Sequence, residues 1–543
     1  MEKLSLAVGF VRKLNTRTIL IVLFCVIYFI FEYYIAKHSD GRHYKHFTLQ
    51  MAVLPILFFN CGRIASVLLN TIFVLILIFD FDISYNCQLV TSGTLDAVMG
   101  TNRHEAASML STICWPVLCA VMLVLGGVAA LSWKLGRWNP RIALVSFVFI
   151  LLSGTYACWR VYTLKSSLRS ETWADIGELS DIASSLRQRS PGVVGDVTYI
   201  MVMSVQRALD KRFIVHPHAI TDAQVIGRHA GRVHNIIFVM GESSLAKRYG
   251  VYGYASQNTT PGFRAAQAQG QVCIVGKVHS NANLTRYSVP MTFSFETPLA
   301  RNQFFQEKNL IEMARDNGYK TFWISSQDGT GPYARSYGYI SEYSDYTTRQ
   351  DYNNKTNGVT WKDESLLPVL ADRLRDSAPY KLYVLHINGS HQSYEDKVRP
   401  EDRAALPQAD TYDQSIHHTD DLVQRVMAMA ASTLGDYTLI YTSDHGEIVG
   451  VGHGYQYGGY DQYTIPMIIH DSHGTGRYCD MAEALRNEDG YYTSIMNKYL
   501  LLDMLGYDVD THYINSMRKS DTILHSDLKV YAYANLPTAR DRR

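Results

Sequence analysis

The sequence predicts a bundle of membrane-spanning helices followed by an α/β domain with a mostly parallel sheet. Up to about Trp159 the chain is strongly apolar, whereas most of the Asp, Glu, Lys, Arg and Tyr residues follow it. From Val233 onward, apolar runs of strand length alternate with helix-like stretches, which is typical of a sheet covered by helices on both faces. With 543 residues, the chain is long enough for both parts.

Five membrane-spanning helices are expected in residues 1–160. Three stretches have the roughly 20 apolar residues that cross a bilayer, and they are Thr18–Ala36, Ser111–Trp133 and Arg141–Trp159. The stretch Phe47–Phe79 is longer than one span and is interrupted at Asn60–Arg63, so we interpret it as two helices joined by a tight turn. A cleavable signal peptide explains the first stretch less well, because it lacks a small-residue cleavage site and further spans follow.

The basic residues of the loops predict the orientation of these helices. Lys and Arg are retained on the cytoplasmic side of a membrane. If the amino terminus is cytoplasmic, eight basic residues near the ends of the spans lie on the cytoplasmic side: Lys3, Arg12, Lys13, Arg17, Arg63, Lys134, Arg137 and Arg141. Arg42 and Lys45 in the first outer loop run against this orientation. With five crossings, everything after the last span lies outside the cytoplasm, as does the polar loop 80–110.

Residues 161–232 are expected to form amphipathic linker helices. Between Glu171 and Arg187, apolar residues recur every three or four positions, which is helical spacing. A second apolar patch, Tyr199–Val205, is too short to cross a bilayer. Such helices either lie on the membrane surface or pack on the soluble domain, and an amphipathic pattern does not separate these alternatives.

The charge and cysteine content narrow the functional classes. The 51 basic and 50 acidic residues nearly balance, which gives no electrostatic reason to expect a nucleic-acid partner. Six of the eight cysteines lie in or near the membrane part, which leaves Cys273 and Cys479 in the exported part. At most one disulfide can form there, so the stability of this part must come mainly from a large core.

Residues 233–543 are expected to form the soluble α/β domain. The strand-length apolar runs are Asn235–Met240, Lys320–Ser325, Lys381–Ile387, Tyr437–Thr442 and Ile465–His470. The helix-like stretches between them include Phe305–Asn317, Glu364–Asp376 and Asp413–Ala431. Because strands and helices alternate, the sheet should be mostly parallel.

Metal-binding side chains follow two of these strands. Glu242 comes just after the first run, and Asp444 and His445 come just after the fourth. Ligands of open α/β sheets gather at the carboxyl ends of the strands, and Zn²⁺ accepts both carboxylate and imidazole donors. Alone, Glu242 could cap a helix and the Asp-His-Gly sequence could be a turn. Their occurrence together at strand ends favours a metal site.

Several hydroxyl side chains lie between the two motifs. A metal ion turns an alcohol, which is a poor nucleophile, into a usable alkoxide. Thr285, Ser288, Thr292 and Ser294 all carry such a hydroxyl. Their spacing alone does not choose among them.

Three motifs resemble, in order, those of the membrane-bound phosphoethanolamine transferases of Gram-negative bacteria, in the alkaline phosphatase and sulfatase superfamily. They are Gly241–Glu242, Thr285–Pro290 and Ser443–Glu447. The segment Thr101–Ala107 and the five-span anchor also resemble that family, so the resemblance covers nearly the whole chain. It implies an α/β/α sandwich of the alkaline phosphatase/sulfatase type as a periplasmic catalytic domain, held by a multi-pass anchor in the bacterial inner membrane.

The resemblance also implies the roles of particular residues. Thr285 would be the nucleophile that takes phosphoethanolamine from phosphatidylethanolamine. It would share Zn²⁺, as one ion or two, with Glu242, Asp444 and His445. The acceptor would be a sugar hydroxyl or phosphate of lipopolysaccharide, in lipid A or the core, or another envelope glycan.

Further residues are expected to contact the substrates. By the same resemblance, His391 and His453 would contact the phosphate or a second metal ion and stabilise charge on the phosphoryl group. The loop residues expected to help bind the lipid are Thr101, Asn102 and Glu105. Three other histidines are weaker candidates, namely His386, His417 and His418.

Two other functions stay open from the sequence. A phosphoglycerol transferase or a phosphodiesterase of the same superfamily would use the same residues on a different head group. From another class, a catalytically idle, membrane-anchored binding protein could keep the fold. Such a protein would show neither stoichiometric zinc nor turnover.

Overall fold

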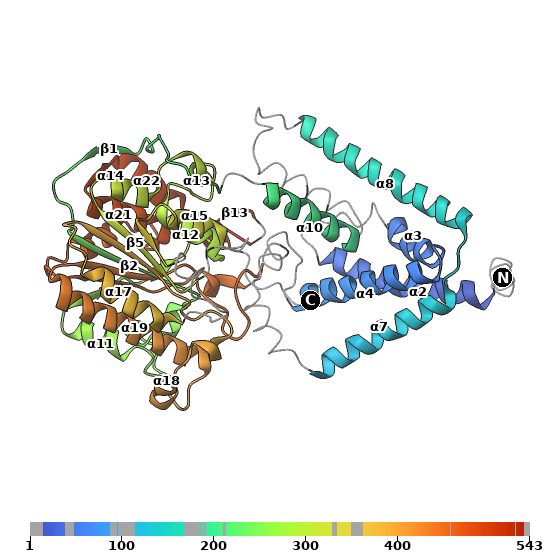
Figure 1. Cartoon of the computed structure of the whole chain (residues 1–543), viewed down its shortest axis with the longest axis horizontal. Coiled ribbons are helices and arrows are strands. Elements are labelled where there is room, and N and C mark those ends of the chain that lie inside the picture. The colour runs from blue at the N-terminus through green and yellow to red at the C-terminus, as the bar shows by residue number, and fades with distance from the viewer. Residues whose placement is uncertain are drawn as a thin grey trace. The chain divides into compact units, whose positions relative to one another are not determined.

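The structure is a computed structural model of the chain, and it falls into two compact units, one within residues 1–210 and one from Lys211 onward (Figure 1). The residues it describes are 15–38, 48–86, 95, 115–167, 183, 187, 192–209, 213–327, 329, 334–348, 362–456, 458–526 and 528–536.

The first unit contains a helix at each of the five predicted spans. They are α2 (Thr16–Lys37), α3 (Thr48–Phe59), α4 (Arg63–Asn86), α7 (Trp115–Leu135) and α8 (Pro140–Ser167). Within the described residues, three stretches are long and apolar enough to cross a membrane: Thr16–Lys37, Arg63–Tyr85 and Trp115–Leu135. α3 has only 12 residues, and the apolar part of α8 ends at Tyr156. An apolar helical anchor is therefore confirmed, but its predicted number of five spans is not.

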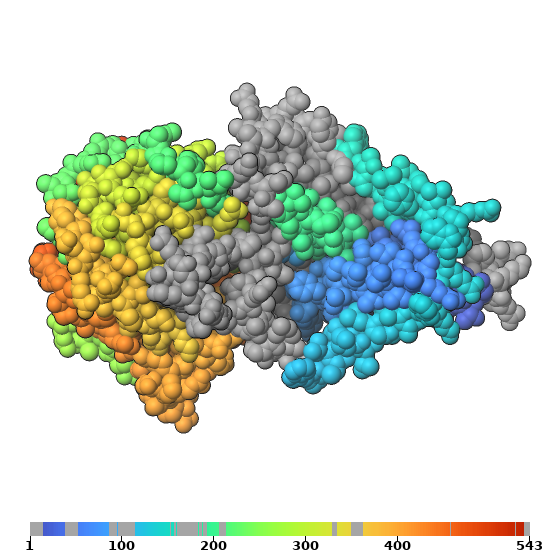
Figure 2. Space-filling model, viewed as in Figure 1, coloured from blue at the N-terminus to red at the C-terminus, as the bar shows by residue number. Residues whose placement is uncertain are grey.

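The surface of these helices is apolar, as a lipid-facing surface must be. Exposed large apolar side chains include Leu123 on α7 and Val145 and Leu152 on α8. These helices appear in blue and cyan in the space-filling view (Figure 2). Soluble proteins rarely expose apolar patches of this extent, because water contact with them is unfavourable.

One linker helix packs on the anchor. α10 (Gly192–Leu209) includes the predicted patch Tyr199–Val205 and lies against α2 and α4. The backbone N–H of Val193, in its first turn, donates to Glu32 Oε1 over 3.2 Å. Of the predicted helix Glu171–Arg187, only residues 183 and 187 are described, so that helix stays a prediction.

The second unit is built on a seven-stranded mixed sheet with the order β3-β9-β8-β2-β7-β5-β6. The five predicted strands are found as β2 (Asn235–Gly241), β5 (Lys320–Ser325), β7 (Lys381–His386), β8 (Thr438–Ser443) and β9 (Met467–Asp471). β3 (Val272–Ile274) and β6 (Tyr346–Thr347) form the edges. The pairings of β2, β5, β6, β7 and β8 with one another are parallel. β9 is antiparallel to both of its neighbours, which makes the sheet mixed.

Helices cover both faces of this sheet (Figure 1). One core layer contains residues of α11 (Pro261–Ala268), α17 (Leu366–Leu374) and α19 (Thr411–Leu434). The other contains residues of α12 (Thr285–Phe293), α14 (Leu310–Asp316), α15 (Arg335–Ser341), α20 (Arg477–Ala484) and α21 (Asn497–Leu505). The middle strand, β2, is buried along its whole length. This arrangement is the predicted α/β/α sandwich.

Shorter elements complete the second unit. The other strands among the described residues are β1 (Val225–Arg228), β4 (Val278–His279), β10 (Tyr492–Thr493), β11 (Tyr507–Val509), β12 (Thr522–Leu524) and β13 (Val530–Ala532). The other α-helices among them are α13 (Gln303–Gln306), α18 (Pro400–Ala405) and α22 (Thr511–Ser520).

The predicted helix Phe305–Asn317 is shorter in the structure. α14 begins at Leu310 because Asn309 caps it. The Asn309 side chain accepts hydrogen bonds from the backbone N–H groups of Ile311 and Glu312, and Glu312 accepts in return from Asn309 N. This capping box ends the extended segment and starts the helix.

Cys273 in β3 and Cys479 in α20 form a disulfide across 206 residues of sequence. Because the bond closes a long loop, Cys479→Ser is expected to lower the free energy of unfolding of this unit by about 2–5 kcal/mol. Denaturation of the purified protein in urea, followed by fluorescence, measures this change. Reduction of the wild type should cause the same loss, whereas Cys119→Ser in the anchor should not. Equal stability of the reduced and oxidised protein would contradict the expectation.

Candidate active site

The ends of two neighbouring strands bring the metal-binding motifs together. β2 and β8 are parallel, and Gly241 at the end of β2 is paired with Ser443 at the end of β8. The next residues, Glu242 and Asp444, therefore leave the sheet side by side at its carboxyl edge.

Thr285 is the first residue of α12 and reaches these strand ends. Its Oγ1 donates a hydrogen bond to Glu242 Oε2 over 3.1 Å and lies 3.2 Å from His445 Nε2. His445 Nε2 lies 3.3 Å from both Glu242 Oε1 and Asp444 Oδ2. All four side chains are buried. The positive end of the α12 dipole favours negative charge at Thr285.

The other hydroxyl groups of this segment donate hydrogen bonds to backbone carbonyls that precede them in the chain. Ser288 Oγ donates to Leu284 O over 3.2 Å, and Thr292 Oγ1 donates to Ser288 O over 3.2 Å. Ser294 Oγ donates to Pro290 O over 2.7 Å. The geometry therefore favours Thr285, a choice that the spacing of the sequence did not make.

The negative charge of Glu242 is compensated by its neighbours, whereas that of Asp444 is not. Burial raises the pKa of Glu242, but the nearby histidines, His445 foremost, lower it to about 2. Burial and the proximity of Glu242 raise the pKa of Asp444 well above its ordinary value. Asp444 Oδ2 is buried and has no hydrogen-bond donor within the described part of the chain. A divalent cation would supply the missing partner for this oxygen.

The donor set fits a zinc ion. Glu242, His445 and His453 each offer one ligand atom, and these atoms lie within 4.8 Å of one another. Donors that bind one tetrahedral zinc ion lie about 3–4 Å from each other, which is close to the spacing of these three atoms. Carboxylate and imidazole donors beside a hydroxyl are typical of catalytic zinc.

His453 and His391 lie beside these residues. The ring of His453 is centred 4.0 Å from the ring of His445 and 5.4 Å from the ring of His391. His453 Nδ1 lies 2.8 Å from Glu447 Oε2, and the hydroxyl of Tyr394 donates to Glu447 Oε1 over 2.7 Å. Burial raises the pKa of Glu447 to about 7. Glu447 thus holds the His453 ring through its Nδ1 atom.

Glu447→Gln is expected to lower turnover about 10–100-fold, the usual cost of removing a carboxylate that orients a functional histidine. An activity assay on the purified protein measures this loss. Tyr394→Phe is the matched control, since it removes one partner of Glu447 but keeps the carboxylate beside His453, and its loss should be smaller. Equal losses in the two variants would show that Glu447 acts only through general packing.

Two residues without a predicted role hold the Glu242 carboxylate. Gln327 Nε2 donates to Glu242 Oε2 over 3.1 Å and to Ile387 O over 3.0 Å. Ser243 Oγ donates to Glu242 Oε1 over 2.7 Å. Gln327 lies two residues beyond the end of β5. A position just after a strand is the signal that identified Glu242 in the sequence, and the same signal could have identified Gln327.

Gly389 allows the turn after β7 to pass directly beside Glu242. Its φ is +49°, and a Cβ there would lie 2.8 Å from Glu242 O and 2.9 Å from Glu242 N. Only glycine tolerates both conditions. The backbone N–H of Ser390 donates to Glu242 O over 3.0 Å. The turn that carries His391 is therefore packed on the backbone of a candidate metal ligand.

The remaining candidates lie elsewhere. Thr101, Asn102 and Glu105 fall outside the described residues, and their contact with lipid stays a prediction. His386 is buried against the rings of Trp323 and Tyr337. His417 and His418 both lie beside Asp402.

A family model described as Sulfatase matches residues 234–506, which are half of the chain and contain every strand of the central sheet. The chain belongs to the sulfatase family. The predicted resemblance to this superfamily is thereby confirmed, and the candidate site lies inside the matched region.

Several curated proteins are similar to the chain. The putative transferase YhbX of Escherichia coli (strain K12) is 28% identical over 284 residues, which are 50% of this chain and 49% of YhbX. The phosphoethanolamine transferase EptC of Escherichia coli O18:K1:H7 is 24% identical over 386 residues, 67% of this chain and 65% of EptC. The chain thus spans about half of YhbX and just under two thirds of EptC.

One solved structure is similar over both units. The integral membrane lipooligosaccharide phosphoethanolamine transferase A of Neisseria meningitidis superposes with a TM-score of 0.57 at 19% identity. The match covers 89% of this chain and 95% of that protein. The two proteins therefore share a fold.

Proposed function

We propose that the protein transfers phosphoethanolamine from phosphatidylethanolamine to a sugar of lipopolysaccharide, in lipid A or the core. The observation that carries this proposal is the meeting of Thr285 with Glu242 and His445 at hydrogen-bond distance. A buried hydroxyl in such a setting suits a covalent phosphoryl transfer. The relatives named phosphoethanolamine transferases support the choice of head group.

In the first step Thr285 attacks the donor lipid. Its hydroxyl proton passes to solvent, and Thr285 Oγ1 forms a bond to the phosphorus. The bond between phosphorus and the diacylglycerol oxygen breaks, and this oxygen takes a proton from His391 or His453. The products are diacylglycerol and a phosphoethanolamine ester of Thr285.

In the second step the acceptor oxygen replaces Thr285 on the phosphorus. The histidine that gave up its proton takes the proton of the acceptor, and the Thr285 oxygen takes a proton from solvent. Zn²⁺ held by Glu242, Asp444, His445 and Thr285 would lower the pKa of the hydroxyl and offset charge on the phosphoryl oxygens. If a second ion binds, His391 and His453 are its candidate ligands.

The apolar anchor suits this reaction. Donor and acceptor are both amphiphiles, so a site held at the membrane surface meets them at a high effective concentration. We propose a five-span topology in the inner membrane with the catalytic domain in the periplasm. Thr101, Asn102 and Glu105, on the loop that would face this domain, are proposed contacts for the lipid.

Lipid A and core oligosaccharides from cells with and without this protein test the proposal. Mass spectrometry should show phosphoethanolamine on one of these glycans only when the protein is present. Glycerol phosphate in its place would identify a phosphoglycerol transferase. Identical envelope glycans in both strains would favour an idle binding protein.

A further inference from the structure

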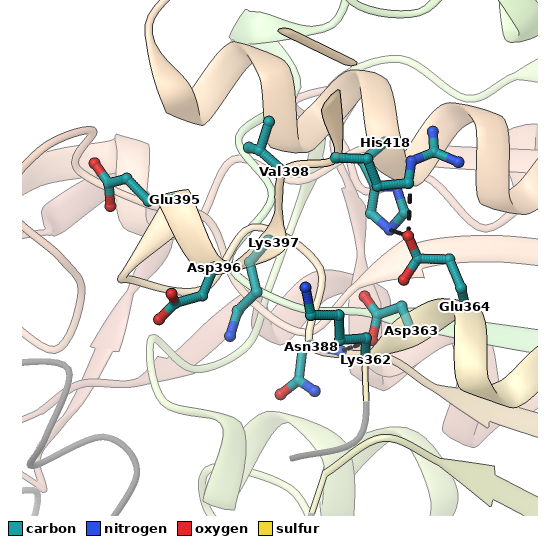
Figure 3. Close-up of a pocket in the computed structure, with 10 residues that line it drawn as sticks. Lys362, Asp363, Glu364, Asn388, Glu395, Asp396, Lys397, Val398 and His418 are labelled. Carbon is teal, nitrogen blue, oxygen red and sulfur yellow. Dashed lines mark hydrogen bonds and ion pairs between the residues drawn. The ribbon is translucent and has the colours of Figure 1, made fainter. Parts of the chain in front are cut away.

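A polar pocket of about 270 Å³ opens in the second unit beside the turn that carries His391 (Figure 3). Its walls come from the start of the 3-10 helix Asp363–Ser365, the turn after β7, the 3-10 helix Tyr394–Lys397 and α19. All of its lining residues belong to the described part of the chain. The volume is just below the roughly 300 Å³ at which pockets for drug-sized ligands begin, so it suits one sugar phosphate rather than a whole glycolipid.

Two lysines are the uncommitted cations of this pocket. Lys362 and Lys397 have no ion pair or hydrogen bond with any residue that the structure describes, and Figure 3 draws no dashed line from either ammonium group. Arg399, in contrast, is fully engaged. It donates to both Asp402 oxygens over 2.8 Å and to Asp421 Oδ2 over 2.8 Å.

The carboxylates inside the pocket are already paired. Asp363 accepts hydrogen bonds from Ser326 Oγ over 2.6 Å and from the N–H groups of Asn388 and Gly389 over 2.8 and 2.9 Å. Glu364 lies 3.5 Å from His418 Nε2 and 3.6 Å from Arg399 Nε. Glu395 and Asp396 are exposed at the rim. Inside the pocket, the charge without a partner among the described residues is therefore that of the two lysines, while Glu395 and Asp396 add negative charge at the rim.

The pocket is joined to the candidate active site by short contacts. Asn388 lines the pocket, and its neighbour Gly389 is packed on the backbone of Glu242. The Asn388 side chain donates to Ser326 O over 3.2 Å, and the next residue, Gln327, holds Glu242. A group bound in the pocket would thus lie against the same turn that presents His391.

We propose that this pocket binds a phosphate group of the acceptor sugar, through Lys362 and Lys397. This inference rests on the proposed function for its choice of acceptor. It follows from two ammonium groups without partners among the described residues, a partly open volume of sugar-phosphate size and a wall shared with the active site. A phosphate held there would orient a second group of the acceptor toward Thr285, which makes the two lysines specificity residues.

Binding of a small probe tests the pocket directly. Glucosamine 1-phosphate should bind the full-length, zinc-loaded protein in detergent, and unphosphorylated glucosamine should bind at least about tenfold more weakly, as for the loss of a charged contact. The double variant Lys362→Met, Lys397→Met should lose this difference. Lys519→Met, which removes an exposed lysine of α22, is the matched control and should keep it. Equal binding of the probe by the wild type and the double variant would overturn the proposal.

The two half-reactions separate this inference from the proposed function. In the double variant, formation of the Thr285 adduct from phosphatidylethanolamine should be unchanged, while transfer to a phosphorylated lipid A should fall about tenfold or more. Transfer to dephosphorylated lipid A should be equal in both proteins. If the double variant transferred to both acceptors as well as the wild type does, the inference would be overturned. If the wild type formed no adduct, the proposed function would be rejected, and the probe experiment alone would decide the inference.

Asp396→Asn distinguishes an acceptor phosphate from a donor head group. A phosphate should bind as tightly or more tightly when this rim carboxylate is removed, because like charges repel. Phosphoethanolamine carries an ammonium group, so it should bind more weakly to the Asp396→Asn variant than to the wild type. Weaker binding of N-acetylglucosamine 1-phosphate, which carries no ammonium group, by the variant, together with a preference for phosphoethanolamine, would overturn the assignment to the acceptor.

Discussion

Thr285→Ala is expected to abolish transfer, with a fall in turnover of at least about 10⁴-fold, as for the loss of a catalytic nucleophile. The reason is geometric. Thr285 Oγ1 lies 3.1 Å from Glu242 Oε2 and 3.2 Å from His445 Nε2, and the hydroxyls of Ser288, Thr292 and Ser294 bond to backbone carbonyls instead. A transfer assay with a fluorescent phosphatidylethanolamine measures the loss.

Two control variants make this result specific. Thr285→Ser keeps the hydroxyl and should retain measurable turnover. Ser243→Ala removes the other hydroxyl on the Glu242 carboxylate and should reduce turnover far less than Thr285→Ala. Loss of turnover in Ser243→Ala, with Thr285→Ala still active, would move the nucleophile from Thr285 to Ser243.

Removal of the metal is expected to lower turnover about as much as Thr285→Ala does. Chelation of the purified protein should abolish turnover, and Zn²⁺ should restore it. Because the ion binds only the folded site, zinc at about 100 times its Kd should stabilise the protein by about 2.7 kcal/mol. Elemental analysis and thermal unfolding measure the bound metal and the stabilisation.

Asp444→Asn is the matched variant for this experiment. It keeps the shape of a fully buried side chain but removes the charge that an ion would neutralise. The variant should bind little zinc, gain no stability from it and show no turnover. Full activity of the chelated wild type, with no metal detected, would contradict the metal-dependent account.

Much of the fold could be predicted because the strands are long apolar runs. β2 and β8 are buried over their whole length, so their apolar residues are continuous and easy to recognise. The site could be predicted because Glu242 and Asp444 come directly after these strands, and paired parallel strands end together. The family resemblance supplied the choice of Thr285, which spacing did not.

Features that depend on distant contacts could not be predicted. The antiparallel direction of β9 follows from its pairing with β3 and β8, which an apolar run does not reveal. The start of α14 depends on a capping box at Asn309 that hydrophobic periodicity overlooks. The hydrogen bond from Gln327 to Glu242 joins residues 85 positions apart in the sequence. The pocket with Lys362 and Lys397 is likewise built from four separate segments of the chain.

Peptide mapping of the zinc-loaded protein after incubation with phosphatidylethanolamine, without an acceptor, tests the central claim most directly. The account predicts phosphoethanolamine on the peptide that contains Thr285, its absence in Thr285→Ala and in the chelated protein, and its disappearance when lipopolysaccharide is added. Phosphoethanolamine on another residue, or transfer to lipopolysaccharide with no adduct on Thr285 at any time, would contradict it.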